Sequence, residues 1–109
     1  MKEEEEENVH NVKKAASHFA KAAEKIALAA KDCHEAAKLD LQVAEMELNA
    51  AVGEEERLQL ENQVQVCEMA VEDAERDLED AQRRKARADE EYEVAKRNYD
   101  AACSSKSKK

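Results

Sequence analysis

The stretch "LNAAVGEEERL", residues 48–58, contains the only glycine of a 109-residue chain that has no proline. Glycine adopts the left-handed conformation that ends many helices. Three glutamates follow at positions 54–56, where the helix dipole would favour acidic residues in the first turn of a new helix. We therefore expect one helix to end and a second helix to begin near Gly53.

A second interpretation keeps one helix running through Gly53. A glycine inside a helix costs only about 1 kcal/mol relative to alanine. Glu45 and Glu47 would also lie unfavourably close to the negative end of a helix that stopped here. Such a continuous helix would pair antiparallel with a second copy of the chain and form the same layers as a hairpin.

The composition is typical of long helices. Ala, Glu, Lys, Leu and Arg make up 66 of the 109 residues, and the chain has one glycine and no proline to interrupt a helix. The net charge of −9 disfavours nucleic acid as a partner. The longest apolar run, "IALAA" at 26–30, is too short to cross a membrane. Three cysteines and no signal-like apolar segment predict an intracellular, cytoplasmic protein.

Apolar residues recur every three or four positions on both sides of Gly53. The first stripe consists of Val9, Val12, Ala16, Phe19, Ala23, Ile26, Ala30, Cys33, Ala37, Leu41, Ala44, Leu48 and Ala51, with one extra four-residue step before Leu41. The second consists of Leu60, Val64, Cys67, Val71, Ala74, Leu78, Ala81, Lys85, Ala88, Tyr92, Ala95, Tyr99 and Ala102. This spacing predicts two long helices that meet along a coiled-coil seam.

Side-chain sizes along the stripes favour antiparallel pairing. When residues whose numbers add up to 107 or 108 face each other, most layers set a large side chain against a small one, as in Ala30 with Leu78. A parallel pair would instead stack Tyr92 on Tyr92. The pattern resembles the alanine coil, a packing mode of closely spaced antiparallel helices. We therefore expect an all-α antiparallel hairpin that assembles into a four-helix bundle.

The expected organisation follows from these stripes. Residues 1–8 form an acidic tail, and the hairpin covers 9–103, with helices at about 9–51 and 55–103 joined by a turn at 52–54. Residues 104–109 form a basic tail. The core residues expected to contribute most are Phe19, Ile26, Ala30, Leu41, Leu48, Leu60, Val71, Leu78, Tyr92 and Tyr99.

The first helix has a second apolar seam. Alanine or valine recurs every seven residues from Ala15 to Ala50, and larger side chains join this repeat towards the turn. A helix with two apolar seams usually packs against two neighbours. The candidate partner interface comprises Ala22, Ala29, Ala36, Leu39, Val43 and Met46.

Other functional features are weak. The histidines and carboxylates do not form the repeated Glu-x-x-His motifs of helical metal sites, so we expect no metal, no cofactor and no enzyme activity. "RRKAR" at 83–87 leaves nuclear localisation open, although a solvated face of oppositely charged residues four positions apart explains it better. Residues 12–39 are basic and amphipathic, but their largely alanine face argues against peripheral membrane binding.

The expected function is therefore structural. The second seam predicts a protein-interaction module that self-associates, as a homodimer, or docks onto a partner. The alternative is a regulatory helical protein that binds one specific heterotypic partner, and the sequence does not separate these two hypotheses. Peripheral membrane binding through the first helix is a weaker alternative.

Overall fold

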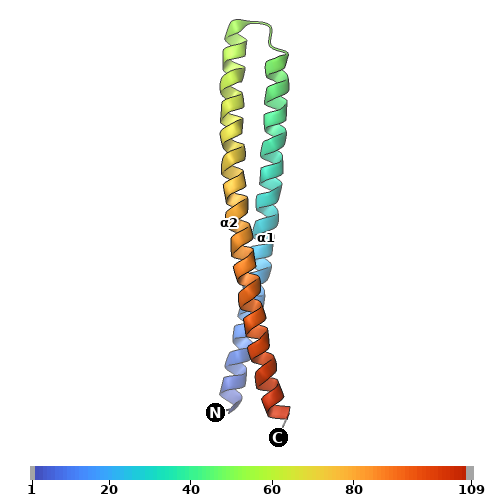
Figure 1. Ribbon diagram of the computed structural model, residues 1–109, viewed down its shortest axis with the longest axis vertical. Coiled ribbons are helices and arrows are strands. Elements are labelled where there is room, and N and C mark those ends of the chain that lie inside the picture. Colours follow the sequence, from blue (N-terminus) through green and yellow to red (C-terminus); the bar gives the residue numbers. More distant parts are fainter. Residues whose placement is uncertain (1, 108–109) are drawn as a thin grey trace. The chain divides into compact units, whose positions relative to one another are not determined.

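The computed structural model describes residues 2–107 and shows two long helices packed against each other as a hairpin. Helix α1 spans Lys2–Asn49 and helix α2 spans Glu54–Ser107. The two helices run in opposite directions and are joined by a short turn (Figure 1). No strand occurs within the described residues. The predicted all-α hairpin is confirmed, and the continuous helix through Gly53 is wrong.

Both helices extend into the segments that we expected to be tails. Helix α1 already begins at Lys2, and its first turn contains Glu3, Glu4 and Glu5. Acidic residues stabilise this end of a helix because they face the positive end of its dipole. Helix α2 continues to Ser107. Residues 1, 108 and 109 of the predicted tails lie outside the described part of the chain.

The turn differs from the expected one in the role of its glycine. Helix α1 ends in a tightened turn, in which Ala51 N donates to Leu48 O at 3.2 Å. Gly53 does not adopt a positive φ, so it does not end α1 in the left-handed conformation. Its carbonyl accepts from Arg57 N at 2.9 Å, which makes Gly53 the residue that caps the start of α2.

The hairpin comprises two compact units. The turn unit is Ala27–Ala81, and the terminal unit consists of residues 2–26 and 82–107 within the described chain. Each unit contains one stretch of α1 packed against one stretch of α2. The same kind of seam holds both pairs of helical segments together.

This inner seam consists of buried and half-buried residues at alternating steps of four and three. In α1 it contains Val9, Lys13, Ala16, Ala20, Ala23, Ala27, Ala30, His34, Ala37, Leu41, Ala44, Leu48 and, just past the helix end, Ala51. In α2 it contains Leu60, Val64, Cys67, Val71, Ala74, Leu78, Ala81, Lys85, Ala88, Tyr92, Ala95, Tyr99 and Ala102. Matching the two seams outward from the turn pairs Leu48 with Leu60 and Val9 with Tyr99, and every layer between them joins residues whose numbers add up to 108.

Four residues of the predicted first stripe lie outside this seam. Phe19 is 68% exposed and Ile26 is 56% exposed, and Val12 and Cys33 are exposed as well. The layers expected to hold them contain Lys13, Ala20, Ala27 and His34 instead. The physical reason is the regular repeat of α2, whose seam residues alternate steps of four and three without interruption. The predicted stripe of α1 has two consecutive steps of four before Leu41. Such an interruption in one helix alone would put the facing layers out of register.

The seam is narrow and rich in small side chains. The buried hydrophobic residues among those described are Ala27, Ala44, Val64, Ala81 and Ala95. Ala27 and Ala81 occupy the same layer of the turn unit and are 8% and 5% exposed. A layer of two alanines is filled only when the helices approach closely, so larger residues of α1 next to the seam remain outside it.

Candidate interaction surface

A second row of apolar residues follows α1 on its solvent-exposed surface. In the terminal unit it contains Val12, Phe19 and Ile26, which are seven residues apart, with Ala15 and Ala22 between them. All five side chains are exposed. Seven-residue spacing keeps them on one face of the helix. Each of the three larger residues directly precedes a residue of the inner seam, which places this row on one side of it.

The same row continues along the α1 stretch of the turn unit. Leu39, Val43 and Met46 are between 53% and 70% exposed. The smaller members here are Ala29, Cys33, Ala36 and Ala50, and all of them are exposed. We call the whole row, from Val12 to Ala50, the outer seam. Its members alternate between steps of three and four residues. The one exception is the step from Ala36 to Leu39, which is three residues where the alternation would give four.

The outer seam contains all six residues predicted as a partner interface. Ala22, Ala29 and Ala36 lie among its small members, and the three others are its large members near the turn. The prediction missed Val12, Phe19, Ile26 and Cys33 because it assigned them to the inner seam. The strict repeat of α2 was the signal that could have located them correctly.

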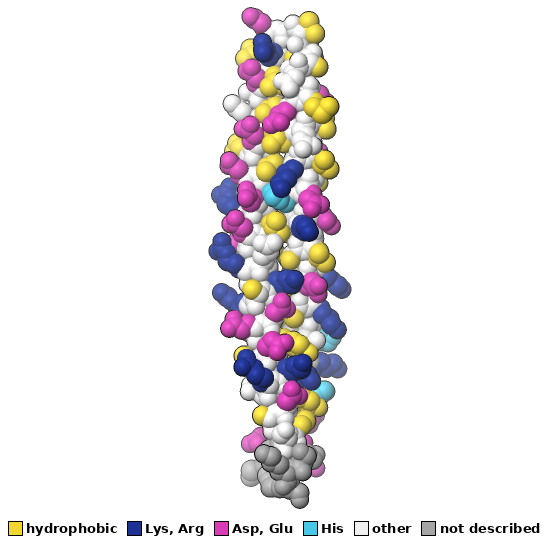
Figure 2. Space-filling view, turned by 45° about the vertical axis from the view of Figure 1, so that its right-hand side comes forward, with side chains coloured by type: hydrophobic (Ala, Val, Ile, Leu, Met, Phe, Trp, Pro, Cys, Tyr) yellow, Lys and Arg dark blue, Asp and Glu magenta, His cyan; other side chains and the backbone are white. Residues whose placement is uncertain are grey.

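Helix α2 has no comparable row within its described residues. Its large exposed apolar side chains are Leu58, Val66, Met69 and Val94. Charged and amide residues separate most of them, and only Val66 and Met69 are close in sequence. Figure 2 shows hydrophobic side chains open to solvent among charged ones. Because an interface of useful size needs a contiguous apolar surface, α1 is the better candidate.

Charges are distributed unevenly along α1. Residues 13–38 contain six lysines and three acidic residues, whereas residues 39–49 contain Asp40, Glu45 and Glu47 and no basic residue. Helix α1 is therefore basic in one part and acidic in the other. A binding partner with the reverse arrangement would be attracted to both parts.

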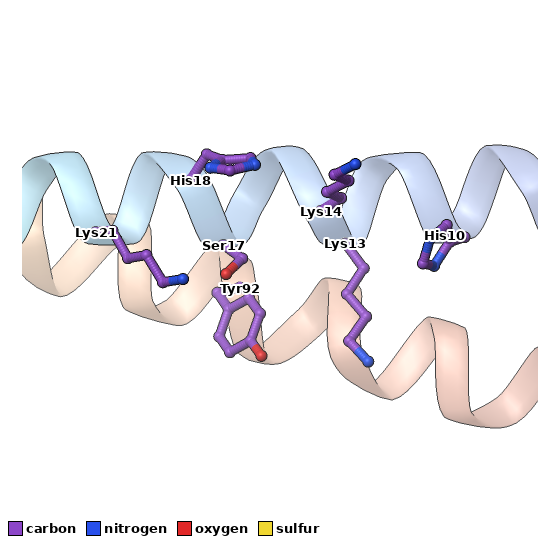
Figure 3. Close-up of a pocket in the computed structure, with 7 residues that line it drawn as sticks. All are labelled: His10, Lys13, Lys14, Ser17, His18, Lys21 and Tyr92. Atoms are coloured by element: carbon purple, nitrogen blue, oxygen red, sulfur yellow. The ribbon is translucent and has the colours of Figure 1, made fainter.

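A shallow basic hollow lies where α1 and α2 meet in the terminal unit. Its volume is about 370 Å³, and it is lined by His10, Lys13, Lys14, Ser17, His18, Lys21 and Tyr92. In Figure 3 Lys13, Lys21 and Ser17 reach towards α2, whereas Lys14 and His18 lie on the other side of α1. The cations therefore diverge, and the hollow does not have the convergent polar groups of a small-molecule site.

Tyr99 joins the two helices beside this hollow. The Lys13 ammonium nitrogen lies 4.2 Å from the centroid of the Tyr99 ring, and the His10 ring lies 5.5 Å away. The pKa of Tyr99 is raised above its ordinary value. The main cause is a hydrogen bond with Cys103, followed by the charge of Cys103, desolvation and the charges of Asp100 and Glu6.

Neither a metal centre nor a membrane span is found in the described chain. Residues 2–107 contain no group of three or more His, Cys, Asp or Glu side chains that could hold a metal ion. No helix among them is long and apolar enough to cross a membrane. The three cysteines are free thiols: Cys33 and Cys103 are exposed, and Cys67 is half-buried in the inner seam.

Comparison with known proteins gives no family. No family model, curated protein or solved structure matches this chain.

Proposed function

We propose that this protein is a self-associating helical interaction module, and that the outer seam of α1 binds a second copy of the chain. The observation that supports this proposal is a row of exposed apolar residues at coiled-coil spacing along α1. Apolar side chains at this spacing leave one face of a helix in contact with water, and a second helix packed on that face would bury them.

The hairpin also buries few hydrophobic side chains. Its inner seam has only five buried hydrophobic residues among those described, and four of them are alanines. A pair of helices with so little buried surface gains stability when a further layer packs against it. A second copy of the chain can form this layer, because its α1 has the same outer seam and needs the same burial.

The free energy available depends on how much of the outer seam is used. Complete burial of a large apolar side chain contributes about 1.5–3 kcal/mol, so each of the large members, which are 53–70% exposed, offers about 1–2 kcal/mol. Leu39, Val43 and Met46 together offer about 3–6 kcal/mol in each copy, or about 6–12 kcal/mol in a symmetric dimer, against an association cost of about 4–15 kcal/mol. Burial of Val12, Phe19 and Ile26 as well doubles the free energy gained. An interface along the whole outer seam therefore stabilises a dimer more than an interface limited to the residues near the turn.

Light scattering on matched variants tests the proposal. We expect the wild type to be a dimer at micromolar concentration and Val43→Glu with Met46→Glu to be a monomer, since the new charges would be buried without partners. The control is Leu58→Glu, which adds a charge at a leucine that is 61% exposed and lies on α2, outside the outer seam. The control variant should remain a dimer, and circular dichroism should show all three proteins to be helical.

Three results would contradict self-association through the outer seam. A monomeric wild type would show that the seam does not bind a second copy and would leave the heterotypic partner as the remaining protein-binding hypothesis. A monomer that sediments with vesicles of phosphatidylserine and phosphatidylcholine would favour membrane binding instead, because exposed Phe19 and Ile26 lie close to Lys21 and Lys25. Equal dimerisation of wild type and seam variant would place the interface elsewhere.

A further inference from the structure

Resting on the proposed self-association, we infer that the second copy binds antiparallel, with α1 packed on α1 and the twofold axis close to Lys31. The inference comes from the order of large and small residues along the outer seam. Because α1 is one helix from Lys2 to Asn49, the position of each seam residue from Val12 to Met46 follows from its number, and Ala50 continues the helix by one hydrogen bond to Met46 O. The seam can then be matched with its own reverse.

The reversed seam fits the original one layer by layer. Residues of the two copies whose numbers add up to 61 or 62 form six layers: Val12 with Ala50, Ala15 with Met46, Phe19 with Val43, Ala22 with Leu39, Ile26 with Ala36, and Ala29 with Cys33. Five of these layers set a small side chain against a larger one, and only Phe19 with Val43 joins two large ones. Such complementarity fills an interface without voids or overlap.

Parallel pairing lacks this complementarity. In a parallel dimer every residue would meet its own copy, so Phe19 would stack on Phe19, and Ala22 on Ala22. Layers of two large side chains would hold the helices apart and leave the alanine layers unfilled. The alternation that suits an antiparallel pair therefore disfavours a parallel one.

The charges next to the seam favour the same orientation. Lys25 directly precedes Ile26, and Glu35 directly precedes Ala36, so both lie on the same side of the outer seam. Antiparallel pairing brings Lys25 to the level of Glu35 of the second copy, and symmetry forms this pair twice. It also brings Lys14 and Lys21 of each α1 to the level of Glu47 and Asp40 of the other. A parallel dimer would align like charges along its whole length.

Engineered disulfides test the orientation. In a chain with Cys33→Ala, Cys67→Ala and Cys103→Ala, we would add Ala22→Cys and Leu39→Cys singly and together. These positions are 17 residues apart, about 25 Å along one helix, so they cannot bond within a chain. Antiparallel pairing places them in one layer. Mild oxidation should then convert most of the double variant to a covalent dimer on a non-reducing gel, while each single variant stays monomeric on that gel.

A second double variant controls for register and for chance collisions. Ala22→Cys with Val43→Cys also bears two seam cysteines, but these lie about one helical turn out of register and should give at least tenfold less covalent dimer. Covalent dimer from the single variants would show parallel pairing and overturn the inference. Absence of covalent dimer from a protein that light scattering shows to be dimeric would overturn the inference but leave self-association standing. A monomeric wild type would instead overturn the proposed function itself.

Discussion

Lys13 of α1 lies over the ring of Tyr99 of α2, with its ammonium nitrogen 4.2 Å from the ring centroid. Both residues belong to the inner seam, in neighbouring layers of the terminal unit. A lysine at a seam position would ordinarily weaken a coiled coil. Here its aliphatic part lies along the seam while its charge rests on the electron-rich face of an aromatic ring.

This contact predicts a specific energetic coupling. Lys13→Gln and Tyr99→Leu should show a coupling of about 0.5–1 kcal/mol in a double-mutant cycle of urea unfolding, the range of exposed cation–π pairs. Lys14→Gln is the matched control, because Lys14 lies on the other side of α1 in Figure 3. It should not couple to Tyr99. Equal coupling of both lysines would indicate a general charge effect rather than this contact.

The register of the inner seam predicts a compensating pair of substitutions. Ala30 and Leu78 occupy one layer, since their numbers add up to 108. Ala30→Leu should crowd Leu78 and cost about 1–3 kcal/mol. Adding Leu78→Ala restores one large and one small side chain and should recover most of the loss. Thermal unfolding of the single and double variants checks this, and purely additive losses would show that the two residues do not meet.

Gly53 predicts a stabilising substitution. A Cβ added there would meet no heavy atom within 4 Å, and its φ is not one that only glycine tolerates. Because its carbonyl accepts the first hydrogen bond of α2, a serine here would cap the helix with its hydroxyl and would lose less freedom on folding. Gly53→Ser should raise the unfolding free energy by about 0.5–1 kcal/mol in urea denaturation. A loss of stability would instead indicate that the turn requires glycine.

Tyr99 predicts a pH dependence. Its raised pKa means that the folded protein favours the neutral phenol, mainly through Cys103. The resulting stabilisation is present below the ordinary tyrosine pKa and is lost as the pH rises through the raised value. Cys103→Ala should lower the pKa of Tyr99 towards its ordinary range. Titration of tyrosinate absorbance in a Tyr92→Phe background measures this, and an unchanged titration would contradict the role of Cys103.

The sequence predicted the hairpin because its signals are local and repeated. The stripe of α2, from Leu60 to Ala102, keeps one phase, and each of its members is half-buried or buried. Antiparallel pairing followed from the alternation of residue sizes. The role of Gly53 was harder to predict, since a glycine can end one helix or cap the next, and only the backbone geometry shows which occurs.

The phase of α1 could not be chosen from hydrophobicity alone. At four levels the helix offers two adjacent candidates for the inner seam, such as Phe19 and Ala20, and at each level the residue left outside the seam is the more hydrophobic one. Hydrophobic ranking selects Phe19, but close packing against α2 selects Ala20. The same choice recurs at Ile26 and Ala27. Wherever the small residue packs inside, the large one is left on the surface, which is why the candidate interface was only half predicted.

The unbroken seven-residue repeat of the inner seam also constrains how such a protein can change length during evolution. Removing residues 28–34 together with 74–80, which face each other in the seam, would delete two complete layers and leave all the others matched. Removing either segment alone would shift every layer between the deletion and the termini. Insertions and deletions in this chain should therefore be tolerated as compensated pairs of heptads, one in each helix, and seldom as single events.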